Sequence, residues 1–118
     1  MKSMLKDVIS GGEQYKALAF ICPGCVGNGG GTGLHMIPVE PTTQSPAWTW
    51  NGDLEAPTLE PSIRTTWESP REKFVCHSYL RDGVFEFLGD STHEFAGKKV
   101  PLQELPSWFL SWGDDDDE

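Results

Sequence analysis

The chain has 118 residues, a mass of 13.1 kDa and a formal net charge of −9. This length corresponds to one domain with a modest core. The 13 glycines and 9 prolines predict a folded, turn-rich domain and argue against a helical bundle. The acidic balance argues against direct binding of nucleic-acid phosphates. Five of the acids form the terminal DDDDE, which leaves a mildly acidic −4 for residues 1–113.

The amino-terminal sequence MKSMLKDVISGGEQYK contains no apolar stretch of signal-peptide length. No run in the chain approaches the ~20 apolar residues of a membrane span. We therefore expect a cytoplasmic protein with no membrane partner. In a reducing compartment, neighbouring cysteines are first interpreted as metal-binding or catalytic, and an odd count of three cysteines also argues against a closed disulfide framework.

The first half of the chain predicts a hairpin that carries cysteines at its tip. Residues 1–14 hold a small apolar cluster that suits a short helix or a frayed arm. Residues 15–21 are apolar and run into the CPGC motif, which favours a strand because proline disfavours helix in the residue before it. A return strand is expected over residues 35–39. The glycine tract over 27–33 predicts a flexible loop, because it lacks the ending of a phosphate-binding loop.

The second half of the chain predicts more strands. Residues 74–80 and 84–88 form the clearest hairpin, and Gly83 supplies the positive φ that its turn requires. The remaining elements are extended segments at 48–50, 57–63 and 63–67, a helical turn at 91–96, and an apolar segment at 100–110 that packs against the sheet.

These elements predict a mainly β domain of the small α+β type, which is a compact, hairpin-rich sheet with one short helix, stabilised by zinc. The predicted organisation is an arm or short helix over 1–14, one β-rich metal-binding domain over 15–112 and a disordered acidic tail over 113–118. At this size, a bound metal would add substantially to the stability of the core.

The cysteines give the sharpest chemical signal. Cys22 and Cys25 are separated by Pro-Gly, and two intervening residues let both thiolates reach one ion. Cys76, on the strand 74–80, is the third thiol. Two alternatives stay open: a thioredoxin-like redox pair, which would need a helix where a glycine tract follows, and inert thiols.

The fourth ligand is expected to be a histidine. The antiparallel hairpin brings His93 back beside Cys76, which makes His93 the expected fourth ligand. His35, on the return strand after the CPGC tip, is the alternative. Thiolates combined with imidazole in a reducing compartment indicate Zn²⁺ or an iron–sulfur centre, and we expect Zn²⁺.

A closed site of three cysteines and one histidine leaves two histidines unassigned. His77 follows Cys76 but points to the opposite face of the strand, so the two cannot easily hold one ion. If the metal activated water instead, the candidate proton carriers would be His77, Asp90 and Glu94. The ordinary alternative for His77 is a partly exposed cross-strand residue.

The segments CPGC, HMIPV, WTWNGDLEAPTLEPSI and CHSYLRDGVFEFLGDSTHEFAG resemble a poorly characterised family of small proteins from tailed phages and bacteria. The resemblance covers about residues 15–105, and CHS-x-x-x-DG-x-x-x-FL-x-DSTH is its most specific part. Some members are named ammonia monooxygenases, a name that a chain without a membrane span or a copper-like histidine cluster does not support. Bacterial members can lie near genes for ubiquitin-like conjugation. The resemblance implies no established reaction.

We therefore expect a small zinc-binding phage accessory protein in the host cell cytoplasm. It would act as a protein-binding module with a structural Zn²⁺ site, and its partner would be a host or phage protein bound through the wall WTWNGD and the loops. The alternative is a zinc-dependent hydrolase with metal-activated water. A weaker alternative is an acidic decoy that mimics nucleic acid. The sequence leaves open whether the chain is an enzyme.

Overall fold

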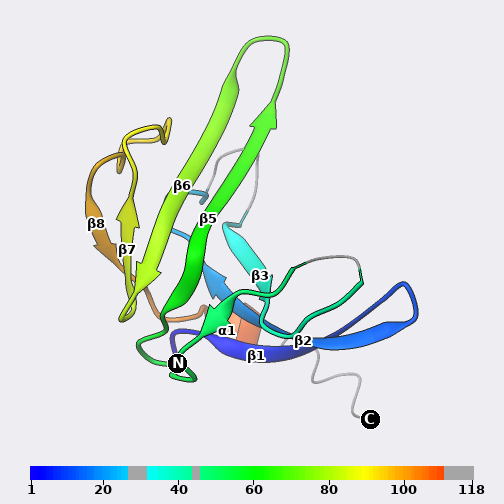
Figure 1. Cartoon of the computed structure of the whole chain (residues 1–118). Coiled ribbons are helices and arrows are strands. Elements are labelled where there is room, and N and C mark those ends of the chain that lie inside the picture. Colours follow the sequence, from blue (N-terminus) through cyan, green and yellow to red (C-terminus); the bar gives the residue numbers. More distant parts are fainter. Residues whose placement is uncertain (27–31, 44–45, 111–118) are drawn as a thin grey trace.

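The structure of the protein is a computed structural model that describes residues 1–26, 32–43 and 46–110. It contains two antiparallel sheets with the strand orders β1-β2-β3 and β4-β5-β6-β7-β8 (Figure 1). One short helix, α1 (Ser107–Leu110), is present in the described ranges. No helix there is long and apolar enough to cross a membrane. The predicted mainly β fold is confirmed, whereas the predicted tail over 113–118 lies outside the described residues.

The first sheet consists of β1 (Met4–Ser10), β2 (Glu13–Ile21) and β3 (Leu34–Pro38). The expectation of a short helix or a frayed arm over residues 1–14 is wrong, because β1 pairs with β2 along its whole length. Gly11 and Gly12 both have positive φ and form a two-residue hairpin turn. The glycine pair therefore marks a turn between two strands instead of the end of a helix.

The second sheet consists of β4 (Thr49–Trp50), β5 (Leu59–Glu68), β6 (Lys73–Arg81), β7 (Val84–Phe87) and β8 (Lys99–Pro101). The predicted β6–β7 hairpin is confirmed, and Asp82 and Gly83 at its turn have φ values of 49° and 75°. The helical turn expected at 91–96 is wrong, because this segment forms a loop whose hydroxyl groups bond to β6. The helix lies instead at α1.

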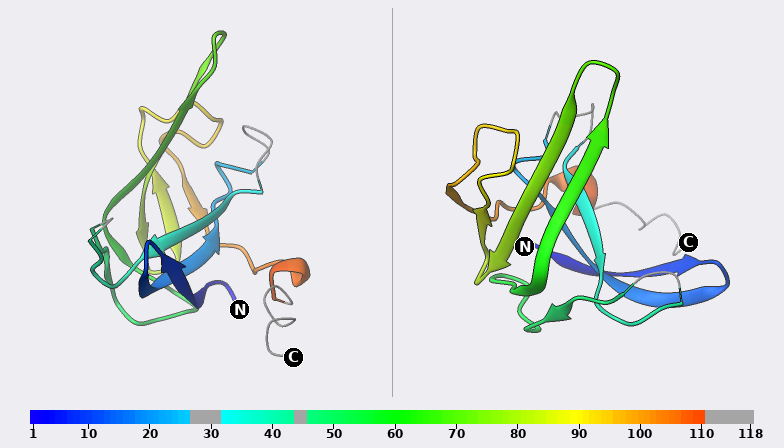
Figure 2. Two further views of the ribbon diagram at one scale, coloured as in Figure 1. Left: turned by 90° about the vertical axis from the view of Figure 1, so that its right-hand side faces the viewer. Right: turned by 45° about the horizontal axis from the view of Figure 1, so that its top comes forward.

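The core fills the space between the two sheets, which cross each other (Figure 2). It takes side chains from both halves of the chain, and its largest fully buried apolar members are Leu18, Phe20, Leu59, Leu80, Phe85 and Leu102. The β5–β6 hairpin extends beyond the other strands of its sheet (Figure 1). The inner face of the five-stranded sheet is therefore closed by the core, and its outer face is open to solvent along β5 and β6.

Replacing Gly83 with alanine should lower the free energy of unfolding by about 1–3 kcal/mol. The residue has φ +75°, and a Cβ at this position would lie 3.0 Å from Ala56 Cα. Gly89→Ala is the matched control, because its Cβ would meet no heavy atom within 4 Å and no positive φ is required there. Urea denaturation of the three proteins measures the difference, and equal stabilities for the two variants would contradict it.

Candidate active site

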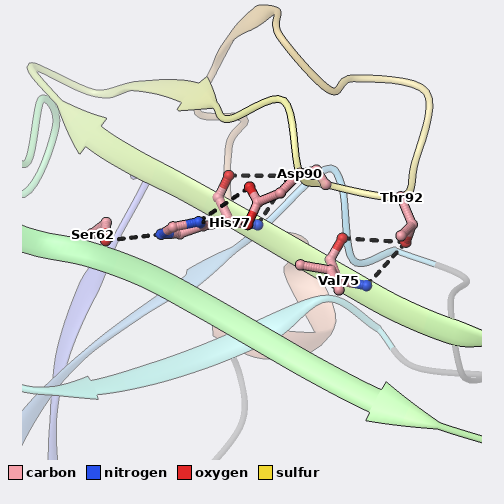
Figure 3. Close-up of polar contacts among 6 residues, drawn as sticks. Ser62, Val75, His77, Asp90 and Thr92 are labelled. Carbon is pink, nitrogen blue, oxygen red and sulfur yellow. Dashed lines mark hydrogen bonds and ion pairs between the residues drawn. The ribbon is translucent and has the colours of Figure 1, made fainter.

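Three polar side chains from three different elements meet on the outer face of the five-stranded sheet (Figure 3). Ser62 Oγ, on β5, lies 3.0 Å from His77 Nε2, on β6. His77 Nδ1 lies 3.1 Å from Asp90 Oδ2 and 3.2 Å from Asp90 Oδ1, in the loop after β7. The three groups therefore form one continuous hydrogen-bonded chain.

The chemistry of the three groups fixes the direction of the chain. An ionised carboxylate only accepts hydrogen bonds, so His77 Nδ1 carries the proton that faces Asp90. His77 Nε2 then has a free lone pair, which accepts the Ser62 hydroxyl proton. A hydroxyl, an imidazole base and an orienting carboxylate in this order can generate a serine nucleophile. The side chains of His77 and Asp90 are 23% and 52% exposed, so a large substrate can reach them from solvent.

Ser62 is placed by an irregularity in the pairing of β5 with β6. The register shifts between Leu59 and Ile63, and Arg64 then stands opposite His77. Ser62 shares a face with Arg64, which brings its hydroxyl to the imidazole. The Trp48 indole N–H donates to the Ser62 carbonyl oxygen at 3.4 Å. Trp48, expected in a partner-binding wall, thus holds the backbone of Ser62.

Asp90 is placed by a loop whose side chains pair with β6. Ser91 Oγ accepts a hydrogen bond from His77 N–H at 3.0 Å and donates one to the His77 carbonyl at 3.1 Å. Thr92 Oγ1 accepts from Val75 N–H at 2.9 Å, and Thr92 N–H donates to the Val75 carbonyl at 2.8 Å. These hydroxyls satisfy β6 backbone groups that a neighbouring strand would otherwise satisfy, and they hold the loop beside the imidazole (Figure 3).

Three cysteines cluster on the opposite face of the same sheet. Cys22, Cys25 and Cys76 are buried, free of disulfides and have all their sulfur atoms within 4.8 Å of one another. The sulfurs of Cys22 and Cys76 are 3.6 Å apart. Thiolates bound 2.3 Å from a tetrahedral ion lie about 3.8 Å apart, so this spacing suits a shared metal. The cluster could hold a metal ion.

The two histidines that were considered as fourth ligands both lie beside the cluster. His93 Nε2 is 3.3 Å from Cys76 Sγ, and His35 Nε2 is 3.4 Å from Cys25 Sγ. Each histidine thus contacts one thiol, whereas only the three sulfurs lie within 4.8 Å of one another. Glu94, the third predicted proton carrier, is exposed, and among the described residues no hydrogen bond joins it to the cluster or to His77.

The surroundings of the two histidines differ. The His93 ring lies directly over the CPGC turn, since a Cβ on Gly24 would be 2.6 Å from His93 Cε1. It also packs edge-on against Phe87, with 4.8 Å between ring centroids. The His35 ring stacks on Phe20 and lines a cavity of about 270 Å³ on the inner side of the sheet. His93 is therefore the more tightly held of the two.

The crowding of the thiols separates their pKa values. The pKa of Cys22 is lowered, because the S–H groups of Cys25 and Cys76 donate hydrogen bonds to its sulfur. The hydrogen bond between Cys25 and Cys22 raises the pKa of Cys25 to about 12. The hydrogen bond between Cys76 and Cys22 likewise raises the pKa of Cys76. Burial lowers the pKa of His93, which keeps its imidazole neutral and able to bind a metal. A cation at the centre would stabilise more than one thiolate.

The model of the BubE family, described as the serine protease of a bacterial ubiquitination-like system, matches residues 2–88. The chain belongs to this family. The matched range contains Ser62 and His77 and ends just before Asp90. Neither the curated proteins nor the solved structures gave a match to the chain.

Membership of a serine protease family overturns the expected function. The prediction that the chain acts as a protein-binding module is wrong, and so are the zinc-hydrolase and nucleic-acid-mimic alternatives, because the family is one of serine proteases. Ser62 lies in no nucleophile motif, so no pattern in the sequence identified it, whereas the cysteine spacing pointed to a metal. The chain order serine, histidine, aspartate also differs from the orders of the chymotrypsin, subtilisin and α/β-hydrolase architectures. Only the fold brings Ser62 to His77.

Replacing Ser91 with alanine should accelerate hydrogen exchange at the His77 amide, because this N–H loses its acceptor. The free energy of unfolding should fall by about 1–3 kcal/mol, since a largely buried donor is left unsatisfied. Exchange followed by NMR measures the effect. The Val75 amide is the internal control, because its acceptor Thr92 Oγ1 is retained in the variant. Similar acceleration at both amides would mean that Ser91 acts on the whole loop and not on His77.

Proposed function

We propose that this chain is a serine protease in which Ser62 is the nucleophile, His77 the general base and Asp90 the orienting acid. The observation that carries the proposal is the continuous chain from Ser62 Oγ through His77 to Asp90, with distances of 3.0 and 3.1 Å. It is supported by the serine protease family, whose model covers the strands that bear Ser62 and His77.

In this mechanism Ser62 Oγ attacks the carbonyl carbon of the scissile peptide bond while its proton passes to His77 Nε2. Asp90 stabilises the imidazolium that forms. The same proton then goes to the nitrogen of the leaving amine, and the peptide bond breaks to leave an acyl ester on Ser62. Water attacks the ester by the reverse route, with His77 again as the base, and releases the carboxylate product.

The substrate is a polypeptide, in our proposal a protein of a bacterial ubiquitination-like system such as the one that the family description names. The three catalytic groups lie on an open sheet face, and none of them lines the cavity beside His35. An open face offers little enclosure to a small molecule, but it can receive a chain segment that brings its own surface. Three free cysteines suit a reducing compartment, and we propose that the protein works in the cytoplasm.

We infer further that the cysteine cluster binds Zn²⁺ through Cys22, Cys25, Cys76 and His93. Three thiolates and one imidazole form a closed tetrahedral site, which stabilises structure and leaves no position for a reactive water. Cys76 adjoins His77 on β6, and His93 lies three residues after Asp90 in the loop. The bound ion would therefore hold both elements that carry the base and its carboxylate.

A fluorophosphonate probe, which forms a covalent adduct with activated serines, should label the wild-type protein at Ser62. Ser62→Ala should abolish labelling, and His77→Ala should slow it by at least about 100-fold because the general base is lost. Ser69→Ala is the matched control, since Ser69 lies in the exposed turn between β5 and β6. Mass spectrometry of the labelled peptide identifies the site, and labelling at another serine would refute the assignment.

His93→Ala should weaken zinc binding by at least about 100-fold, whereas His35→Ala should have little effect. His93→Cys, which restores four ligands, should recover one zinc per chain. Competition with a chromophoric chelator measures the affinities. Because His93 shares a loop with Asp90, fluorophosphonate labelling should fall in His93→Ala and recover in His93→Cys. Loss of zinc in His35→Ala alone would assign the fourth position to His35 instead.

A further inference from the structure

One edge of β5 presents backbone groups to solvent. The N–H and C=O of His77 bond toward the loop after β7, on the side away from β5. In an antiparallel pair, two residues opposite each other either exchange both N–H···O=C hydrogen bonds, or both direct their N–H and C=O groups away from the partner strand. Arg64, opposite His77, therefore points its N–H and C=O away from β6, and so does Thr66, opposite Val75.

This edge has no partner strand within the described part of the chain. The short strand β4 pairs only with Leu59 and Glu60, so the edge is open from Ile63 onward. Arg64 and Thr66 are exposed, and their backbone groups form no hydrogen bond with other described residues. Figure 1 shows this upper part of β5 at the border of its sheet.

The open edge starts beside the nucleophile. Ser62 lies two residues before Arg64 on the same strand, and its own carbonyl is already bonded to Trp48. An unpaired strand edge is a template onto which an extended peptide can add as a further strand. A peptide paired with Arg64 and Thr66 would thus lead toward the Ser62 hydroxyl.

The exposed charge at this edge selects among peptides. The side chain of Arg64 shares the outer face with Ser62 and stands opposite His77. It forms no ion pair with any residue in the described ranges. A carboxylate on the added peptide would give this guanidinium a partner and would fix the peptide along the strand.

We propose that the substrate binds as an added β-strand along the edge formed by Arg64 and Thr66, with an acidic side chain facing Arg64 and its scissile bond at Ser62. This inference rests on the proposed protease function and specifies its substrate as an extended, acidic polypeptide segment. Backbone hydrogen bonds to this edge would hold a peptide of any sequence. Arg64 would add a preference for peptides with an acidic side chain.

The first test uses the wild-type protein and amine-blocked peptides made from a bacterial lysate with trypsin. The peptide cleaved fastest is synthesised as a series in which one backbone nitrogen at a time carries a methyl group. A methylated nitrogen cannot donate to the edge, and only every second residue of an added strand faces it. Cleavage should fall about tenfold or more at alternate positions and much less at those between.

The second test concerns the charge. Cleaved peptides should be enriched in Asp or Glu at one position near the scissile bond. Arg64→Glu should reduce cleavage of these peptides by about tenfold or more relative to uncharged ones, whereas Arg64→Lys should keep the preference. Rates are divided by the rate of fluorophosphonate labelling for each variant, which corrects for any change in the catalytic groups themselves.

The outcomes separate the two proposals. If wild-type Ser62 is not labelled by the fluorophosphonate, the protease function fails. If Ser62 is labelled but no peptide is cut, or if methylation shows no alternation, strand addition is overturned and the protease function stands. If alternation is found but Arg64→Glu leaves the peptide preference as it was, the acidic part of the inference is overturned.

Discussion

Side chains alternate between the two faces of the sheet along β6, and this alternation places both candidate sites of the protein. Successive residues of a strand point to opposite faces of its sheet, so Cys76 enters the inner cluster and His77 joins the hydrogen bonds with Ser62 and Asp90 on the outer face. The two sites are therefore separated by one sheet and joined by one peptide bond. A slip of β6 by one residue would exchange the faces and remove both sites together.

The loop after β7 also sends side chains to both faces of the sheet, although it is not a strand. Asp90 faces outward to the imidazole, and His93 turns inward to the sulfur of Cys76. Between them, Ser91 and Thr92 bind the backbone of β6 through their hydroxyl groups. Net contributions of about 0.5–1.5 kcal/mol for each of these bonds are small singly, but they act on one short segment. The loop is thus fixed at its middle, and its ends supply one group to each face.

Local signals in the sequence were sufficient to predict most of the strands and to single out the three cysteines as possible metal ligands. Asp82-Gly83 marks the β6–β7 turn, and the antiparallel strand after it brings residues 90–93 back beside β6, as predicted from the sequence. Strand β1 was not recognisable, because a short apolar cluster fits helix and strand equally until β2 offers a partner. Ser62 was not recognisable either. Its encounter with His77 depends on a register shift between β5 and β6, which no local pattern encodes.

The two faces of the sheet have opposite physical requirements, and the chain meets both with few residues. The proposed catalysis requires Ser62, His77 and Asp90 to be held within about 0.5 Å of their working positions, yet the outer face would have to stay open to a polypeptide. An open face cannot be made rigid by burial. The rigidity must come from behind, where Cys76 and His93 lie against a packed core containing Phe87. A metal at that point would restrain β6 and the loop at the places where His77 and Asp90 leave them, so the inner site would support the geometry that the proposed outer site needs.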